Sequence, residues 1–504
     1  MRRFVALIAV AAAVLGASAC IPSAPKRAPT SAPGSIGWQD CFDQARAANQ
    51  YLSHSKRVEC GTVKVPKDWN NPDNGQTLDI SLMRIYTGRV EDKKGSVLLN
   101  PGGPGGSGIG FLPYWVQPQT GPAPDALLDN FVAVTFDPRG VGESAPIKCV
   151  SDADLDASFG FDPDPSSQAD FDALVALNRR IDNGCGSELG DDARLFSTVQ
   201  TAHDMDAIRE ALGEDKLTYL GYSYGTELGA VYAQLFPSRV RAFVLDGAVD
   251  VQANAIQHSE EQAMGFERAL TNFDAWCRSN ASQCAISADP KGTIVDQLTK
   301  ARTRPVKGAD GRSATAGWVM VGVTSALYAQ EVWGFLGQAI KDLSSGDASR
   351  IFALADSYAE RDDRGHYSNL FDAFNAITCA DEDNDPTLDQ IRGLQTQWRT
   401  KYPVFGTSLA VGLVSCTLWP GKRDPVPTGP ATGAPPIVVV GTTGDPATPY
   451  ESTQKLADML GVGVVLTWEG EGHTAYPSTQ CITDAVDHYL IDLVVPEKGL
   501  RCPA

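Results

Sequence analysis

Nearly continuous apolar runs recur in two regions of this chain, separated by stretches with helical spacing. Such runs are typical of strands buried on both faces of a parallel sheet. They are Ser96–Asn100, Phe131–Phe136, Lys216–Leu220, Arg241–Asp246, Pro436–Val440 and Gly463–Trp468. Helical patterns at Thr201–Leu212 and Thr479–Leu493 lie among them. Strands that alternate with helices predict an α/β fold with a mostly parallel sheet.

Two earlier segments have a different pattern. Glu59–Pro66 and Thr77–Thr87 alternate β-prone and polar residues, and Asn70–Gly75 supplies turn residues between them. This pattern predicts an antiparallel pair of strands at the edge of the sheet.

Between residues 251 and 425 the buried-strand runs disappear and helical patterns dominate. We expect helices at Glu260–Trp276, Gly317–Leu343, Ala348–Glu360, Asn369–Ile377 and Leu388–Lys401. The segment is long enough to form a domain. The pattern therefore predicts an α/β core in two parts, residues 36–250 and 426–504, with a large helical cap domain inserted at 251–425.

The N-terminus has the features of an export signal. Arg2 and Arg3 precede an apolar run, Phe4–Ala19, which is too short to span a bilayer comfortably. Residues 1–20 are therefore expected to be a signal peptide, and residues 21–35, rich in Pro, Ala and Ser, a flexible tether. Cys20 follows small residues, as in a bacterial lipobox, although Ala17 stands where leucine is usual. The segment predicts an exported protein. Lipidation at Cys20 would hold it at the outer face of the cell membrane, and simple secretion also fits.

The cysteines agree with an oxidising compartment. Without Cys20, ten of the eleven cysteines remain, an even number that suits disulfides. Sequence does not fix their connectivity, but proximity suggests the pairs Cys41–Cys60, Cys149–Cys185, Cys277–Cys284, Cys379–Cys416 and Cys481–Cys502. Close Cys/His ligand spacings are absent from the sequence, so a metal site is not expected.

The formal net charge of −19 argues against nucleic acid and anionic membranes as electrostatic partners. We therefore expect contact with a membrane only through an N-terminal lipid, and we interpret the charge mainly as a source of solubility.

Gly221–Gly225 is a G-x-S-x-G stretch centred on Ser223. An apolar strand precedes it, and a helical pattern that ends before Pro237 follows it. Strand, tight turn and helix form the context of a nucleophile elbow, in which the serine is exposed on a strained turn. The alternative is a serine that only caps the helix.

A serine nucleophile needs a base and an acid that orients the base. Of the six histidines, His473 follows a strand on a glycine-rich loop, the position expected for the base. Two aspartates, Asp445 and Asp246, follow strands and compete for the role of acid. Asp445 is favoured because it lies 28 residues before His473, one helix and one strand apart, so that both loops should emerge at the same edge of the sheet. The chain order Ser, Asp, His is also the one expected of an α/β-hydrolase.

The tetrahedral intermediate of acyl transfer needs hydrogen-bond donors for its oxyanion. The backbone N–H of Tyr224 is one candidate. The glycine-rich loop Asn100–Gly108 follows an earlier strand, and Gly103 is the favoured second donor. A phosphate-binding loop is disfavoured because the lysine and Ser/Thr of that motif are missing.

The loop Pro101–Gly106 resembles the His-Gly-Gly-Pro-Gly-Gly loop of proline iminopeptidases, with Pro101 in place of histidine. The fuller set of motifs is similar to secreted tripeptidyl aminopeptidases of actinobacteria, in the same serine-peptidase family. That set comprises Asn100–Gly108, Asp137–Ser144, Gly221–Thr226, Leu245–Gly247, Gly444–Pro449 and Gly472–His473.

The resemblance implies an α/β-hydrolase with Ser223, Asp445 and His473 as its triad, and with Gly103 and Tyr224 as oxyanion donors. It also implies an acidic cap that captures the amino terminus of a peptide. Candidates for that role from sequence position are Glu143, Glu227, Glu267 and Asp381. Pro101 makes strict proline preference doubtful and favours the tripeptidyl branch.

We therefore expect an exported serine exopeptidase that needs no cofactor and acts on peptides with free amino termini. A carboxylesterase or lipase would use the same three residues, because both reactions share the tetrahedral intermediate. A surface lipoprotein that only binds ligands is a more remote alternative.

Overall fold

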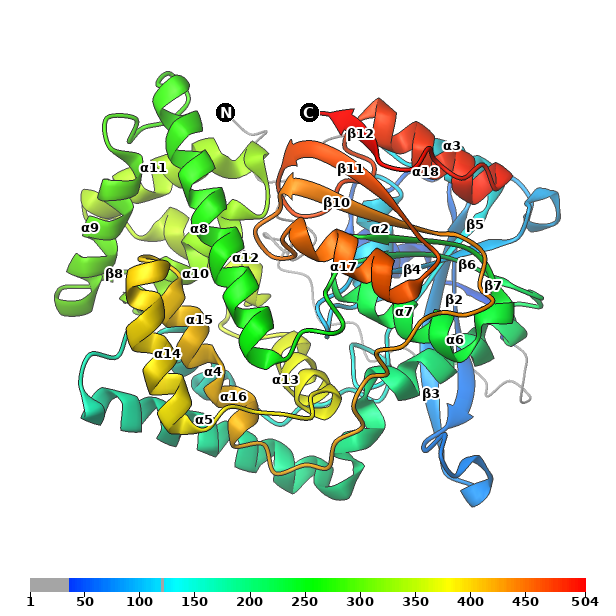
Figure 1. Ribbon diagram of the computed structural model, residues 1–504, viewed down its shortest axis with the longest axis horizontal. Coiled ribbons are helices and arrows are strands. Elements are labelled where there is room, and N and C mark those ends of the chain that lie inside the picture. Colours follow the sequence, from blue (N-terminus) through cyan, green and yellow to red (C-terminus); the bar gives the residue numbers. More distant parts are fainter. Residues whose placement is uncertain (1–35, 119–121) are drawn as a thin grey trace.

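The computed structural model describes residues 36–118 and 122–504. It contains a ten-stranded sheet with helices on both faces and a separate layer of helices beside it (Figure 1). The expected signal peptide, the tether and Cys20 lie outside the described residues.

The sheet has the strand order β1-β2-β3-β5-β4-β6-β7-β10-β11-β12. Pairing is antiparallel from β1 to β5 and parallel from β5 to β12. This confirms the predicted parallel sheet and its antiparallel pair, β2 and β3, toward one edge. The strands are β1 (Gln39–Asp40), β2 (Arg57–Pro66), β3 (Thr77–Tyr86), β4 (Ser96–Asn100), β5 (Val132–Phe136), β6 (Leu217–Tyr222), β7 (Val240–Asp246), β10 (Ile437–Gly444), β11 (Gly463–Glu471) and β12 (Leu500–Pro503).

The central strands are apolar at consecutive positions because helices cover both faces of the sheet. Leu98 packs into one hydrophobic cluster, while its neighbours Val97 and Leu99 pack into the other. The first face is covered by α6 (Thr198–Ala211), α7 (Tyr224–Leu235) and α17 (Glu451–Leu460). The second is covered by α1 (Phe42–Ala48), α2 (Gly108–Trp115), α3 (Asp125–Asn130) and α18 (Gln480–Asp492).

The chain between β7 and β10 forms most of the helical layer, which has its own hydrophobic core. The α-helices of this segment between β7 and β10 are α8 (Ala255–Ser279), α9 (Pro290–Thr303), α10 (Ala316–Leu327), α11 (Trp333–Ser344), α12 (Ser349–Ala359), α13 (Leu370–Asp381), α14 (Leu388–Lys401), α15 (Gly406–Gly412) and α16 (Val414–Thr417). It also holds a short hairpin, β8 (Val306–Lys307) with β9 (Ser313–Ala314).

Two helices that precede the elbow also belong to the helical layer. α4 (Asp152–Phe159) and α5 (Gln168–Leu189) contribute Leu155, Leu177 and Ile181 to its hydrophobic core. Figure 1 shows α5 along the lower edge of the layer, beside α16. We use "helical layer" for α4, α5 and α8–α16 together.

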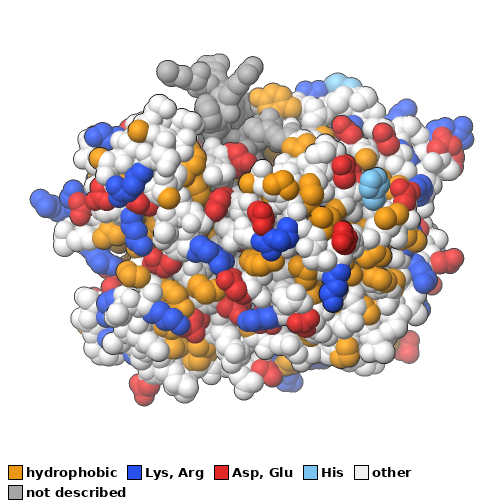
Figure 2. All heavy atoms as spheres, turned by 45° about the horizontal axis from the view of Figure 1, so that its top comes forward, with side chains coloured by type: hydrophobic (Ala, Val, Ile, Leu, Met, Phe, Trp, Pro, Cys, Tyr) orange, Lys and Arg blue, Asp and Glu red, His pale blue; other side chains and the backbone are white. Residues whose placement is uncertain are grey.

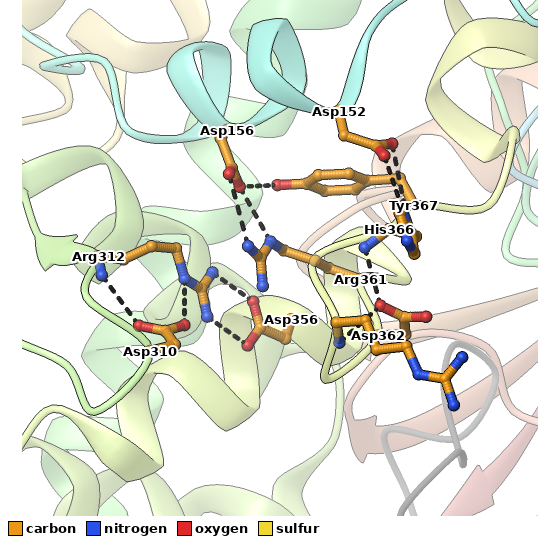
Figure 3. A network of polar contacts seen from close by, with 10 residues as sticks. Asp152, Asp156, Asp310, Arg312, Asp356, Arg361, Asp362, His366 and Tyr367 are labelled. Carbon is orange, nitrogen blue, oxygen red and sulfur yellow. Dashed lines mark hydrogen bonds and ion pairs between the residues drawn. The ribbon is translucent and has the colours of Figure 1, made fainter.

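Polar contacts fasten α4 to the rest of the layer (Figure 3). Asp156 accepts hydrogen bonds from Arg361 Nε over 2.9 Å and from Tyr367 Oη over 2.7 Å. Asp152 Oδ2 lies 2.9 Å from His366 Nδ1. These bonds join a segment before the elbow to the loop between α12 and α13.

One predicted helix is wrong. The pattern of Gly317–Leu343 suggested a single helix, but the structure divides it into α10 and α11, with a 3-10 turn at Gln330–Val332 between them. The helix ends because Ala329 forms an antiparallel β-bridge with Gly472. A distant loop therefore decides where α10 stops.

All five disulfides predicted from proximity are confirmed. Two tie the sheet and its covering helices, Cys41–Cys60 and Cys481–Cys502. The other three pairs lie in the segments that build the helical layer. Each disulfide therefore stabilises one of the two layers.

Acidic and basic side chains are interspersed on the face shown in Figure 2.

Across residues 36–118 and 122–504, no helix has both the length and the apolarity to span a membrane.

Candidate active site

Ser223 lies in a strained turn between β6 and α7, with φ 55° and ψ −124°. Residues other than glycine rarely adopt a positive φ, and those that do cluster at functional sites. Two backbone bonds hold the turn: Ser223 N–H donates to Asp246 O over 2.8 Å, and Thr226 N–H donates to Ser223 O over 2.7 Å. The flanking glycine is required, because a Cβ atom at Gly221 would lie 2.3 Å from Gly225 O. This is the geometry of a nucleophile elbow.

His473 and Asp445 follow neighbouring parallel strands and meet at the same edge of the sheet. His473 Nδ1 lies 3.0 Å from Asp445 Oδ1 and 2.9 Å from Oδ2. Asp445 is fully buried, and its oxygens also accept hydrogen bonds from the backbone of Ala447, Thr448 and Thr474. These donors hold the carboxylate in one orientation. Asp445 can therefore fix the orientation of the His473 ring.

The pKa of His473 reflects two opposed effects. Burial lowers it, but the charge of Asp445, the hydrogen bond to Asp445 and the charge of Asp246 raise it above the usual 6.5. An imidazolium at this position is therefore stabilised, as a general base requires after it accepts a proton.

Thr448 is a residue at this site that sequence reasoning missed. Its hydroxyl donates to Asp445 Oδ2 over 3.0 Å and lies 3.3 Å from His473 Nδ1. The signal was its place three residues after Asp445, within the motif Gly444–Pro449.

The loop after β4 approaches the elbow closely. A Cβ atom at Gly102 would lie 2.9 Å from Ser223 Cβ and 3.2 Å from Tyr224 N. Gly102 N–H already donates to Asn100 Oδ1 over 2.9 Å. The next N–H along the loop, that of Gly103, is therefore the candidate donor to an oxyanion. Tyr224 begins α7, and the first N–H groups of a helix have no partner within the helix. The loop that carries Gly103 therefore lies against the elbow, and the roles of Gly103 and Tyr224 as oxyanion donors stay a prediction.

The helical layer contacts the His473 loop directly. His473 N–H donates to Tyr328 O over 2.8 Å, and the two rings meet edge to face with centroids 5.3 Å apart. Gly472 has φ +113°, and a Cβ atom there would lie 2.9 Å from Tyr328 O. The end of α10 therefore helps to define the position of His473.

Asp246, the competing acid, does not hydrogen-bond His473. Its carboxylate accepts hydrogen bonds from Ala475 N–H and Tyr476 N–H instead. Burial raises its pKa to about 7, while these bonds and the charge of His473 lower it.

Two of the four candidate acids lie close to the elbow. Glu227 is one helical turn beyond Ser223 on α7, and burial raises its pKa to about 7. Burial and the charge of Glu227 raise the pKa of Asp381 well above its usual range. Asp381 accepts hydrogen bonds from Thr198 N–H and Oγ1 over 2.8 and 2.7 Å, and Thr198 Oγ1 also contacts Tyr224 Oη. A pair of carboxylates therefore lies beside the helix that begins at the nucleophile.

The other two acids have different partners. Glu143 accepts a hydrogen bond from Gln44 over 2.8 Å. Glu267 pairs with Lys291 over 3.2 Å and accepts the N–H of Phe405 over 3.1 Å. Neither is joined to the elbow by these bonds. Within the described ranges, no group of three His, Cys, Asp or Glu side chains is arranged to hold a metal ion.

Known proteins are similar in sequence to this chain over most of its length. The model of a family described as "TAP-like protein" matches residues 402–502, which include Asp445 and His473. Serine protease Hip1 of Mycobacterium tuberculosis is 36% identical, with 99% of this chain and 96% of that protein covered. Tripeptidyl aminopeptidase of Streptomyces lividans is 32% identical, with 93% and 86% covered. The chain belongs to the tripeptidyl aminopeptidase family of serine hydrolases.

Members of this family carry different activity names. Carboxylesterase B of Mycobacterium tuberculosis is 36% identical, with 95% of this chain and 91% of that protein covered. Membership therefore identifies a serine hydrolase with the α/β-hydrolase fold, and the bond that is cut depends on the site.

Proposed function

We propose that this hydrolase is an exported serine exopeptidase that releases short, tripeptide-like fragments from free peptide N-termini. Ser223 is the nucleophile, His473 the general base and Asp445 the residue that orients it. The observation that carries this proposal is the double contact of His473 Nδ1 with the buried carboxylate of Asp445, on loops beside a strained Ser223.

The proposed reaction follows from the orientation of the His473 ring, whose Nδ1 contacts Asp445. Because Nδ1 faces Asp445, Nε2 is free to take the hydroxyl proton of Ser223 as Oγ attacks the peptide carbonyl. The N–H groups of Gly103 and Tyr224 stabilise the resulting oxyanion. His473 gives its proton to the departing amine, which leaves an acyl-enzyme. A water molecule, deprotonated by His473, then releases the N-terminal fragment as a carboxylic acid and regenerates Ser223.

The carboxylates of Glu227 and Asp381 favour a peptidase that requires a free amino terminus. Buried carboxylates with raised pKa values gain stability from a cation, and a substrate ammonium is such a cation. An ester substrate without a charged amine could form no ion pair with these carboxylates. The helical layer, which supplies Asp381, would act as the cap that selects the substrate.

Location outside the cytoplasm is part of this proposal. It is supported by the signal-like N-terminus and by five disulfides, which persist in oxidising compartments. Lipidation at Cys20 would hold the enzyme at the outer face of the cell membrane, and cleavage without lipidation would release it. Mass spectrometry of the mature N-terminus distinguishes the two.

The decisive experiment compares three substrates: a tripeptide p-nitroanilide with a free amino terminus, the same compound acetylated, and a short-chain p-nitrophenyl ester. We expect kcat/KM for the free peptide to exceed that for the acetylated one at least tenfold. Equal rates would exclude the aminopeptidase, and turnover of the ester alone would identify an esterase. Ser223→Ala is the control, and its full activity would refute the mechanism.

A further inference from the structure

We propose that Asp246 is a positioning residue that holds the nucleophile and the base at a fixed separation, its backbone fastening Ser223 and its side chain fastening the loop that carries His473. This inference rests on the proposed roles of Ser223 and His473. It gives a function to a buried carboxylate that the triad does not use.

The position of Asp246 in the sheet makes this double role possible. It ends β7, which lies between β6 and β10, and it is in register with Tyr222 on one side and Val440 on the other. Its carbonyl oxygen accepts the N–H of Ser223 over 2.8 Å. The peptide group at the end of β7 is thus a direct support of the elbow.

The side chain of Asp246 reaches the other half of the site. Both of its oxygens lie 3.0 Å from Ala475 N, and Oδ2 also lies 2.7 Å from Tyr476 N. Ala475 and Tyr476 follow His473 by two and three residues. The carboxylate is fully buried, so water does not compete for these bonds. One residue therefore bonds to the nucleophile and to the loop of the base.

The next residue shows how closely this strand end approaches the base. A Cβ atom at Gly247 would lie 3.3 Å from His473 Cε1, and Gly247 has φ +74°. The end of β7 therefore packs beside the imidazole of His473 and also bonds to the loop that carries His473. Displacement of Asp246 would change the position of both reacting groups, and a misplacement of 1 Å can reduce the rate of a reaction about a hundredfold.

Asp246 also acts on His473 through its charge. The ionisable groups that face Asp246 are His473, Asp445 and Tyr222, from three different elements. Burial alone lowers the pKa of His473, and the charge of Asp246 adds to that of Asp445 in raising it. Asp246 carries this charge above its pKa of about 7. Its replacement by a neutral residue removes a negative charge that stabilises the imidazolium, so the pKa of His473 falls.

Two substitutions separate position from charge. Asp246→Asn removes the charge and places an amide N–H against backbone donors, whereas Asp246→Glu keeps the charge but displaces the oxygens. We expect kcat to fall at least tenfold in both variants, with KM changed less than threefold. The acid limb of the kcat/KM–pH profile moves to lower pH in the Asn variant only. Asp246→Glu also keeps the measurement informative if the Asn variant does not fold.

The matched control is Asp487→Asn. Asp487, on α18, is also buried and contacts the same loop. It accepts a hydrogen bond from the side-chain hydroxyl of Tyr476 over 2.8 Å, whereas Asp246 bonds to the backbone of that loop. We expect the control to keep wild-type kcat and pH profile. Wild-type kcat in either Asp246 variant, or equal losses in the control, would overturn the positioning role.

Labelling of Ser223 by a fluorophosphonate distinguishes this failure from failure of the proposed function. If wild-type protein is labelled at Ser223 and Asp246→Asn is labelled equally fast, Asp246 has no positioning role although the hydrolase stands. If wild-type Ser223 is not labelled and Ser223→Ala remains active, the proposed function fails, and with it the role of Asp246. Slow labelling of the Asn variant with a normal melting temperature supports the proposal.

Discussion

Thr448 donates its hydroxyl hydrogen to Asp445 Oδ2 over 3.0 Å. The same carboxylate accepts the N–H of Thr448 through its other oxygen, over 2.9 Å. One residue thus contacts both oxygens of Asp445, which prevents rotation of the carboxylate. The orientation of Asp445, and through it that of His473, therefore depends on Thr448.

We expect Thr448→Val to lower kcat about fivefold, the effect of a single hydrogen bond worth about 1 kcal/mol. Thr448→Ser keeps the hydroxyl and should restore most of the activity. The control is Thr453→Val, because among the described residues the buried hydroxyl of Thr453 has no hydrogen-bond partner. Steady-state kinetics on one peptide substrate measure all three. A fully active Thr448→Val variant would contradict this role.

The activity should decline as pH falls through the pKa of His473, because only neutral imidazole accepts the proton of Ser223. That pKa is raised above 6.5, so the acid limb of kcat/KM should lie above pH 6.5. Asp445→Asn removes the charge that raises it, so the limb moves to lower pH while kcat falls about a thousandfold or more. The exposed Asp458 supplies the control, Asp458→Asn, which should follow the wild-type profile. An unmoved acid limb in Asp445→Asn would argue against the assigned acid.

The sheet, and the placing of Ser223, Asp445 and His473 after strands of that sheet, could be predicted because local sequence determines them. Strands buried on both faces must be apolar at consecutive positions, as β5 is, and this pattern is visible without any structure. The elbow has a required glycine at Gly221. Asp445 and His473 follow strands whose parallel order places their ends at the same edge.

Features set by contacts between distant segments could not be predicted. The break between α10 and α11 depends on the bridge of Ala329 with Gly472, whereas the local pattern there is compatible with a helix. The sequence pattern likewise does not say that α4 and α5 join the helical layer, because the layer that a helix joins depends on distant contacts. Sequence reasoning also left Asp246 open as a possible acid. The contact of His473 with Asp445, and the bonds of Asp246 to the loop after His473, separate the two.

Glu227→Gln should weaken binding of peptides with a free amino terminus. We expect KM for such a peptide to rise about tenfold, the loss of one charged contact of about 1.4 kcal/mol, with little change for the acetylated peptide. In the wild-type enzyme the preference for the free peptide should decrease as pH falls through about 7, because Glu227 then becomes neutral. The ratio of the two kcat/KM values isolates this effect, since both substrates use His473.

Glu143→Gln is the matched control for that experiment, because the carboxylate of Glu143 is bonded to Gln44 on α1. It should leave both KM values unchanged. Equal changes in the two variants, or a ratio of free to acetylated substrate that does not vary with pH, would remove Glu227 from the amino-terminus site.

Arg139→Met should destabilise the fold by breaking a fully buried ion pair. Arg139 Nε and Nη2 donate to the two oxygens of Asp204 over 2.7 and 2.6 Å, and neither side chain is exposed. Removal of one partner leaves a buried charge without compensation, which costs about 3–5 kcal/mol. The midpoint of urea unfolding should fall accordingly. Arg89→Met is the control, since Arg89 pairs with Glu91 at the surface and its loss should not move the midpoint. If Arg139→Met unfolds at the wild-type urea concentration, water or another cation must compensate Asp204, and the buried pair does not stabilise this part of the core.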